Sequence, residues 1–325
     1  MLDVRSCIVA VAALLGALGQ TPSLAQSWPA RPVKLIVSQA AGGAPDIVAR
    51  LVSDRLSRLW GQQVVVDNRP GSGNIIGAQL AARSAPDGYT LFFATAAALV
   101  TNPYTFKSLP YDPARDFVTV GMVGKAPFLV LVHPSVQART LAELFALEKS
   151  QPGKLTFATD GPRNFSGMVA AWLNKLGGTN ILQVPYATMP QGIQDTVAGR
   201  TQLVILAIPV AAPQMKRGAL RALAFTAATR APGYEDVPPV AQTFPGFNFV
   251  GWFAIVAPAG TPEDVVRRAN RDLDTVLKDK EVVGRLSGMG IFTDGADTPE
   301  GTAQFVKAEL ASWGRVVREI GLQPE

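Results

Sequence analysis

The chain has 325 residues, of which 48% are hydrophobic and 17% charged, so it can bury a large core and is neither disordered nor fibrous. Its length favours two domains over one. The formal net charge is +5, but the Lys and Arg residues are scattered, and no aromatic-basic motif resembles a nucleic-acid module. We therefore expect small anionic molecules as partners and no nucleic acid.

The N-terminus has the pattern of a secretory signal peptide. A basic residue precedes the apolar segment 8–18, and Ser23-Leu24-Ala25 places small residues at the cleavage positions. The apolar segment is shorter than the ~20 residues that cross a bilayer, which argues against a membrane anchor. We predict that residues 1–25 are removed and that the mature chain starts at Gln26 outside the cytoplasm. The only cysteine, Cys7, lies in the removed segment, so we expect no disulfide and no cysteine metal site.

Apolar strands and helical stretches alternate along the mature chain, which is typical of an α/β protein with mostly parallel sheet. Two β-rich stretches, 118–132 and 247–260, are each longer than one strand needs. We interpret both as crossovers between two lobes, with the C-terminal third returning to the first lobe. The expected division is a signal peptide at 1–25, lobe one at 28–125 plus 251–325, and lobe two at 126–250.

Two helices with clear start signals are predicted near the C-terminus. Thr261 and Thr298 are each followed by Pro and then by acidic residues, so each hydroxyl should cap a helix that has Pro at its first position. The last helix should bury one apolar face. That face is formed by Phe305, Leu310, Trp313, Val317 and Ile320.

A loop with two glycines follows the predicted strand 33–37, and apolar residues recur at helical spacing after it. Gly42 and Gly43 therefore lie at a helix N-terminus, where unpaired amides carry partial positive charge and can contact an anion. Asp46 falls in the first turn. These residues leave two alternatives open: a loop that binds a phosphate or carboxylate, and a simple turn in which Asp46 caps the helix.

A second strand, turn and helix repeat this arrangement. The strand covers 155–158, the polar turn covers 159–166, and the helical pattern begins at Met168. Two such turns that face each other across a cleft could hold an anionic ligand from both sides. Arg163 could pair with a ligand carboxylate through two hydrogen bonds, or it could neutralise Asp160.

Catalytic chemistry has little support in the sequence. His133 is the only histidine, and a Ser-His-Asp site would depend on it alone. The segment 71–77, GSGNIIG, has the spacing G-x-G-x-x-x-G after Pro70, which is a weak match to a dinucleotide loop. Clusters of His, Cys and carboxylates at metal-ligand spacing are absent. We expect no enzyme, cofactor or metal, and keep a secreted hydrolase that uses His133 as an alternative.

Six segments in order carry a resemblance that extends from about Trp28 to Leu322. They are WPARPVKLIVSQAAGGAPDIVARLV, VVVDNRPGSGNIIGAQLAARSAPDGYTLFF, NPYTFKSLPYDPARDF, VPYATMPQGIQDTVAGR, LRALAFTAATRAPGYEDVPPV and WFAIVAPAGTPEDVVRRAN. With them the chain resembles the substrate-binding proteins of tripartite tricarboxylate transporters, the Bug family of periplasmic receptors. The resemblance implies a type II Venus-flytrap fold, in which two α/β lobes close on a small organic carboxylate. It also implies a monomer whose closed form docks on membrane permease subunits, although a sensor for a signalling partner is an alternative.

The resemblance places the ligand between the loop 38–46 of one lobe and the turn 159–166 of the other, with 186–188 beside it. It favours a carboxylate as the anion that these loops bind. The candidate ligand-binding residues are Ser38, Gln39, Ala40, Gly42, Gly43, Asp46, Thr95, Thr159, Gly161, Arg163, Asn164, Phe165, Ser166, Tyr186 and Thr188.

Several positions depart from the family pattern. Ala41 and Pro45 stand where the family commonly has Pro and Thr, and Gly167 stands where it often has His. The second turn carries larger polar and aromatic residues than the usual Gly and Ser, and the familiar P-Y-K-G becomes Pro-Tyr-Ala-Thr at 185–188. Phe165 and the absence of the usual Lys near Tyr186 favour a flat or aromatic acid over a highly charged tricarboxylate, because each extra buried carboxylate needs donors that this loop lacks.

Overall fold

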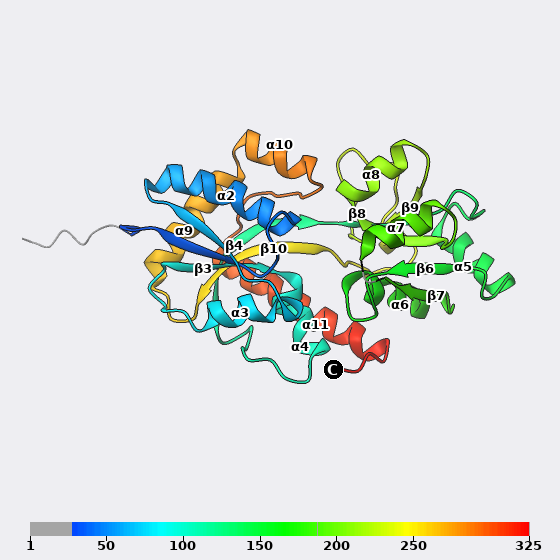
Figure 1. Ribbon diagram of the computed structural model, residues 1–325, viewed down its shortest axis with the longest axis horizontal. Helices are drawn as coiled ribbons and strands as arrows, with labels where there is room; N and C mark the ends of the chain where they lie inside the picture. The colour runs from blue at the N-terminus through cyan, green and yellow to red at the C-terminus, as the bar shows by residue number, and fades with distance from the viewer. Residues whose placement is uncertain (1–27, 187, 325) are drawn as a thin grey trace, which may run out of the picture.

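The computed structural model describes residues 28–186 and 188–324 and shows two α/β lobes side by side (Figure 1). The predicted signal peptide and its cleavage site lie outside the described residues. Within the described part of the chain, no helix is long and apolar enough to cross a membrane.

Lobe one is built on a five-stranded sheet with the order β2-β1-β3-β10-β4. Its strands are β1 (Val33–Val37), β2 (Val64–Asn68), β3 (Thr90–Thr95), β4 (Phe117–Ala126) and β10 (Gly251–Pro258). β1 pairs in parallel with β2 and β3, whereas β10 is antiparallel to both β3 and β4. Its helical segments are α2 (Ala44–Trp60), η1 (Ser72–Asn74), α3 (Ile75–Ala82), η2 (Ala97–Thr101), α4 (Asn102–Thr105), α9 (Glu263–Leu277), α10 (Lys280–Gly288) and α11 (Pro299–Glu319).

Lobe two repeats this plan with the order β7-β6-β8-β5-β9, so β1 and β6 occupy equivalent places. Its strands are β5 (Phe128–Val132), β6 (Thr156–Thr159), β7 (Leu182–Pro185), β8 (Leu203–Ala207) and β9 (Arg221–Phe225). β6 is parallel to β7 and β8, and β5 is antiparallel to β8 and β9. Its helical segments are α5 (Leu141–Ser150), α6 (Phe165–Gly177), α7 (Met189–Val197), α8 (Ile208–Lys216) and η3 (Val240–Gln242).

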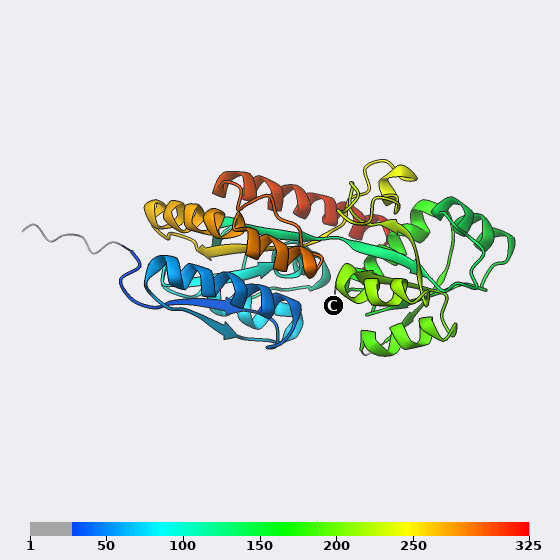
Figure 2. The same cartoon turned by 90° about the horizontal axis from the view of Figure 1, so that it is seen from above.

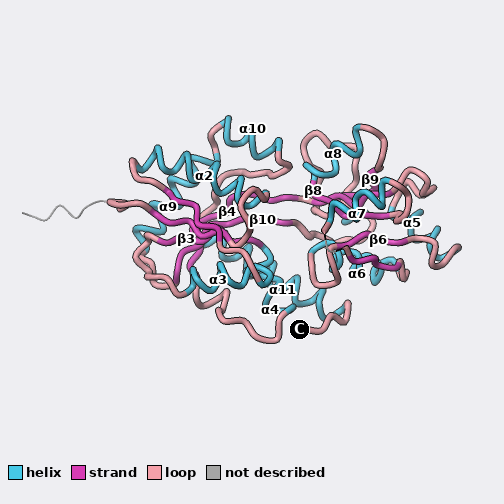
Figure 3. Tube along the Cα trace, viewed as in Figure 1, coloured by secondary structure: helices cyan, strands magenta, loops and turns pink. Residues whose placement is uncertain are grey.

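Both sheets are mixed, whereas the sequence predicted mostly parallel pairing. The strand that arrives from the other lobe, β10 in one sheet and β5 in the other, runs antiparallel to its neighbours. The chain leaves the first sheet after β4 and enters the second at β5, with only Pro127 between them, and it returns between β9 and β10 (Figure 3). Pro127 has no N–H for a ladder, which suits the point where one long β segment changes sheets.

One apolar cluster runs through both lobes. It contains Phe92 and Trp252 in lobe one, Phe157 in lobe two, and Trp313 on α11. The Trp313 ring meets the ring of Phe165 edge-on at 5.8 Å between centroids. Helix α11 therefore packs against both lobes, and it extends from lobe one toward lobe two in both views (Figures 1 and 2).

The two predicted helix starts near the C-terminus have different outcomes. Thr298 caps α11 as predicted, because its Oγ1 accepts from the N–H of Gly301 at 2.9 Å. The predicted cap at Thr261 is wrong: its hydroxyl donates to the Pro258 carbonyl at 2.7 Å and fixes the turn after β10, so the following proline becomes the N-cap of α9. The predicted face of α11 is confirmed as buried or half-buried: Phe305, Leu310, Trp313, Val317 and Ile320.

Candidate functional site

A cavity of about 510 Å³ lies where the carboxyl ends of β1, β3, β6 and β8 meet between the lobes. Its lining comes from lobe one through the loops after β1 and β3, the start of β10 and the segment that holds Met289 and Ile291. Lobe two contributes the start of β5, the turn after β6 and the start of α8. A volume of this size at this edge of two α/β sheets is typical of a small-molecule site.

Among the described residues, three helices of at least nine residues begin at the cavity with no capping hydrogen bond from the side chain of the N-cap residue. They are α2, α6 and α8, whose N-caps are Gly43, Asn164 and Ala207. Side chains cap α5, α10 and α11, whereas α7 and α9 also lack a side-chain cap, and the first residues of these five helices do not line the cavity. First-turn amides carry partial positive charge and are satisfied by caps, water or ligands. The cavity therefore has an electrostatic preference for an anion.

After β1, the carboxylate of Asp46 accepts hydrogen bonds from neighbouring residues of lobe one. It is 2% exposed, and its carboxylate accepts from Gly42 N at 2.8 Å, Arg50 Nε at 3.0 Å and Asn68 Nδ2 at 2.9 Å. Burial by itself raises the pKa of Asp46, but the hydrogen bonds from Arg50, Gly42 and Asn68 outweigh it and hold the pKa below its ordinary value. This carboxylate therefore stabilises the conformation of the loop through hydrogen bonds.

The residues before that loop support the cavity wall. Gln39 lines the cavity, its carbonyl accepts from Asn68 Nδ2 at 3.0 Å, and its buried Oε1 has no hydrogen-bond donor among the described residues. Ser38 is buried and donates to Asn74 Oδ1 at 3.2 Å. A Cβ at Gly77 would lie 2.8 Å from the Ser38 Cα. The glycine that suggested a dinucleotide loop thus allows α3 to pack against the end of β1.

A hydrogen-bonded group holds the segment after β3. Thr95, a predicted site residue, lines the cavity, and its Oγ1 accepts from Ala98 N at 3.4 Å. The Tyr111 hydroxyl donates to the Ala98 carbonyl at 2.6 Å, and Asn102 Nδ2 donates to the Gly73 carbonyl at 2.7 Å. Burial raises the pKa of Tyr111 to about 12, so it remains a neutral donor. These bonds fix the polar side of the cavity wall.

In the turn after β6, Asp160 contacts the start of its own helix. Ser166 Oγ donates to the Asp160 carboxylate, and Asp160 N donates to Ser166 Oγ at 2.9 Å. Asn164 Nδ2 donates to the Asp160 carbonyl at 2.5 Å. Burial raises the pKa of Asp160, and the hydrogen bonds from Ser166 and the amide of Gly167 offset only part of this rise.

Arg163 is half-buried and lines the cavity from lobe two. It is the only ionisable side chain among the described residues that line it. Its Nη2 donates to the carbonyl of Gln323, in the tail that follows α11, at 3.3 Å. The structure thus places one cation at the cavity and links it to the C-terminal tail.

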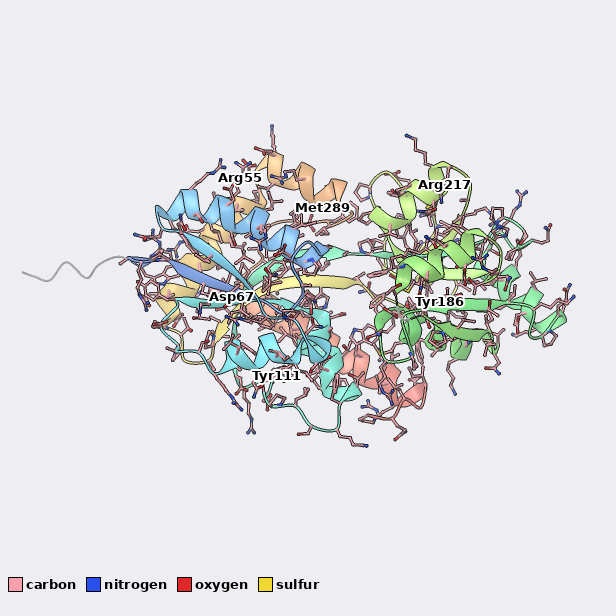
Figure 4. The ribbon with its side chains drawn as sticks, in the orientation of Figure 1. Arg55, Asp67, Tyr111, Tyr186, Arg217 and Met289 are labelled. Carbon is pink, nitrogen blue, oxygen red and sulfur yellow. The ribbon has the colours of Figure 1, made fainter. Side chains whose placement is uncertain are left out.

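The predicted site residues separate into two groups. Those that line the cavity are Gln39, Thr95, Gly161, Arg163, Asn164 and Phe165. Those that lie outside its lining are Ser38, Ala40, Gly42, Gly43, Asp46, Thr159, Ser166, Tyr186 and Thr188. In the second group the Tyr186 hydroxyl, labelled in Figure 4, donates to Asp195 Oδ2 at 2.7 Å and ties the end of β7 to α7. The ligand contacts of all these residues stay predictions.

The sequence analysis missed most of the apolar lining. Phe106, Phe128, Trp252 and Phe253 line the cavity, together with Met289 on the side of lobe one that faces lobe two (Figure 4). These aromatic residues follow or belong to apolar strands and helices, so their pattern resembles that of ordinary core residues. The one available signal was the density of aromatic residues in FNFVGWF, which lies at a predicted crossover.

The hydrolase alternative has no support at this cavity. His133 follows β5 at the end opposite to Phe128, about 16 Å away at the usual rise of a strand. Its Nδ1 lies 2.7 Å from Ser135 Oγ, within the same turn, and His133 does not line the cavity.

Residues 48–322 match the family model described as tripartite tricarboxylate transporter family receptor. The chain belongs to this family. The protein BugT of Bordetella pertussis is 33% identical over 302 residues, which cover 92% of each chain. A Rhodopseudomonas palustris protein solved with adipate is 31% identical, with a TM-score of 0.79, over 92% of this chain and 100% of that one.

A second structure from the same organism, MatC with bound malate, is 29% identical with a TM-score of 0.74, over 89% of this chain and 100% of that one. These similarities confirm the resemblance seen in the sequence and the two-lobe periplasmic-binding fold. The chain is a solute receptor of this family, and the family is not a family of enzymes.

Proposed function

We propose that this receptor captures a small organic carboxylate in the cavity between its lobes and presents it to a tripartite membrane permease. The observation that carries the proposal is the cavity itself, where three helix starts and one guanidinium border a space between two lobes. An anion there gains from the helix dipoles, and the described residues that line the cavity include no carboxylate. The relatives solved with adipate and malate support the same ligand class.

The proposed lobes are 28–125 plus 251–325 and 126–250, as expected from the sequence. Within the described residues, two chain segments join the sheets, one at Pro127 and one between β9 and β10. Rotation about these segments would close the lobes over the ligand, as in other hinge-closing receptors. The closed form, a monomer delivered to the periplasm by its signal peptide, would be the form that the permease subunits recognise.

Titration calorimetry on the mature chain tests the ligand class. We expect one-to-one binding of an organic acid without added metal or nucleotide, because the lining offers helix amides and a guanidinium. A thermal-shift screen finds candidates first, since a ligand at about 100 Kd stabilises the native state by ~2.7 kcal/mol. Uncharged amides of the same acids are the controls. Binding that is confined to cations or nucleotides would refute the proposal.

Small-angle scattering tests the closure. We expect the radius of gyration to decrease when the chain is saturated with an acid found by calorimetry, because the lobes move toward each other. The same chain with the corresponding uncharged amide should not change. An unchanged radius at saturation would rule out the flytrap motion for this receptor.

A further inference from the structure

The lobes also meet beside the cavity, at a glycine. The segment 289–292 follows α10 in lobe one, and its first residue, Met289, lies on the side that faces lobe two (Figure 4). A Cβ on Gly290 would lie 2.7 Å from the Cβ of Ile208 and 3.0 Å from the Cδ of Pro209, both at the start of α8. The backbone of lobe one therefore packs directly against lobe two at this point.

Phe292 extends this contact. Its half-buried side chain packs against an apolar cluster whose buried members, among them Leu206, Ile208 and Ala211, all belong to lobe two. Its backbone is held in lobe one, because Phe292 N donates to the Lys125 carbonyl and Lys125 N donates to the Phe292 carbonyl, both at 2.8 Å. Phe292 thus connects the end of β4 to the core of the other lobe.

Both sides of the contact lie next to the chain crossing at Pro127. In lobe one, Lys125 precedes Pro127 by two residues. In lobe two, Ala207 precedes the start of α8 and pairs with Phe128, the residue that follows Pro127. Points near a rotation axis move little when rigid lobes turn about it. The contact can therefore persist while the lobes open and close.

We propose that the segment 289–292 and the start of α8 form a pivot that sets the angle between the lobes, with Gly290 as its positioning residue. Gly290 is buried and has a φ of 64°, which glycine adopts without strain. A side chain at this position would press on Ile208 Cβ and Pro209 Cδ, atoms attached directly to a backbone, so lobe two would have to move. The effect of the pivot on binding rests on the proposed function, whereas the contact does not.

The pivot borders the ligand cavity without lining it. Gly290, Ile208 and Phe292 lie outside the lining. Their neighbours in the chain that do line the cavity are Met289, Ile291, Ala207 and Pro209. A wedge at Gly290 would therefore hold the lobes apart beside the cavity and move the first-turn amides of α8 away from lobe one. Gly290 would thus affect a bound anion through the lobe angle and not by contact.

The contact between α11 and lobe two is of a different kind. The Trp313 ring meets the rings of Phe165 and Phe249 edge-on, with centroids 5.8 and 4.7 Å away. Aromatic side chains can change rotamer as the lobes turn, whereas the backbone at Gly290 has no such freedom. We therefore assign the pivot to Gly290 and not to the rings at α11.

Distances between two spin labels test the pivot on the mature chain without any ligand. The predicted mature chain has no cysteine, so labels attach only at Lys280→Cys, at the start of α10, and at Arg217→Cys, just after α8. Both native residues are exposed. We expect Gly290→Ala to lengthen the mean distance by about 2 Å or more, because carbon atoms in contact need ~3.5–4.0 Å and rigid lobes enlarge the shift away from the pivot.

Gly153→Ala is the matched control. Gly153 is exposed in lobe two and has a φ of 78°, and no atom lies within 4 Å of its added Cβ. The substitution introduces a left-handed alanine without a clash, so the label distance should equal that of the wild type. Circular dichroism verifies that each variant is folded.

Phe292→Ala tests the same pivot in the other direction. It removes the ring that packs on lobe two and adds no atom at the contact. We expect a broader distribution of label distances than in the wild type, because the lobe angle is less restricted. This variant keeps the test decisive if Gly290→Ala fails to fold.

Calorimetry with adipate, malate and benzoate measures the effect on binding. We expect Gly290→Ala to weaken every acid that binds the wild type by a similar factor, about fivefold or more, because it shifts the lobe equilibrium and touches none of them. Gly153→Ala should leave all affinities unchanged. A loss confined to one acid would show that Gly290 shapes the cavity itself, and would overturn its assignment to the lobe angle.

The label distances separate this proposal from the proposed function. If folded Gly290→Ala and Phe292→Ala both keep the wild-type distance and width, the pivot is wrong, whatever acids bind. If the distances change as expected and no organic acid binds the wild type, the pivot stands and the proposed function fails.

Discussion

The loop after β1 and the turn after β6 hold equivalent places in the two sheets, yet their charged residues have different partners. In lobe one, Asp46 and Arg50 pair with each other, and this loop contributes Gln39 and the start of α2 to the cavity lining. In lobe two, Asp160 bonds to Ser166, and Arg163 lines the cavity. The two lobes therefore offer similar helix dipoles but different side-chain chemistry.

The difference comes from what lies within reach of each carboxylate. Arg50 stands one helical turn after Asp46, and Asn68 on the neighbouring strand completes the set of donors. Asp160 precedes α6 and has hydroxyl and amide donors at the helix start. A glycine turn with an acidic residue thus specifies a helix start but does not specify which side chain meets a ligand. We infer that the loop of lobe one mainly holds the shape of the site, and that the turn of lobe two determines the selectivity for the ligand.

Gly167, in the first turn of α6, gives the largest expected effect. A Cβ on Gly167 would lie 2.0 Å from the carbonyl oxygen of Gly161, a backbone atom that can move only with the whole turn. We expect Gly167→Ala to lower the free energy of unfolding by ~3 kcal/mol or more and to remove ligand binding. Urea denaturation and calorimetry measure the two effects.

Gly42 in the first loop is the matched control. It has a φ of 84°, but no atom lies within 4 Å of its added Cβ. Gly42→Ala should therefore cost only the strain of a left-handed residue, about 1 kcal/mol. Equal costs at the two glycines would contradict the view that the second turn is the more tightly packed.

Asp46→Asn gives the next largest effect. The carboxylate is buried and accepts three hydrogen bonds, two from neutral amides and one from Arg50, so its neutralisation should cost about 2 kcal/mol at pH 7. Because the pKa of Asp46 is lowered in the folded state, its contribution is present above the unfolded pKa and lost as pH falls through the folded value. Urea denaturation at pH 7 and below pH ~4 should show the variant and wild type converging in acid. A constant difference at all pH values would count against this.

Asp160→Asn should have the opposite sign. The pKa of Asp160 is raised in the folded state, so the folded protein binds this proton more readily and the ionised carboxylate opposes folding above the folded pKa. The amide oxygen of Asn can still accept from Ser166, so we expect the variant to be equally stable or up to about 1 kcal/mol more stable at pH 7. The wild type should gain stability relative to the variant as pH falls toward the unfolded pKa. A variant that is clearly less stable at pH 7 would show that the charge of Asp160 stabilises the turn.

The sequence predicted both turns because glycines, helix periodicity and capping residues act over a few positions. The two-lobe fold was predicted from the length, the two long β-rich stretches and the family resemblance. The prediction failed where the answer depends on distant groups. The Thr261 hydroxyl could cap the next helix or donate to a nearby carbonyl. It donates to the Pro258 carbonyl at the end of β10. Strand direction in the crossing strands depends on how the chain enters each sheet, which periodicity does not encode. Phe128, Trp252 and Phe253 have the pattern of core residues, and only the meeting of the lobes exposes them to a cavity.

Arg50→Ala gives the smallest expected effect and tests the comparison most directly. The Arg50 side chain is 53% exposed, so water weakens its pair with Asp46, and Gly42 and Asn68 continue to satisfy that carboxylate. We expect a loss of about 0.5 kcal/mol of stability and no change in the affinity for an organic acid. Arg163→Gln, measured in the same titration, should lose affinity with little loss of stability. If Arg50→Ala weakened binding as much as Arg163→Gln, the charges of the first loop would act on the ligand, and selectivity would have to be assigned to both lobes.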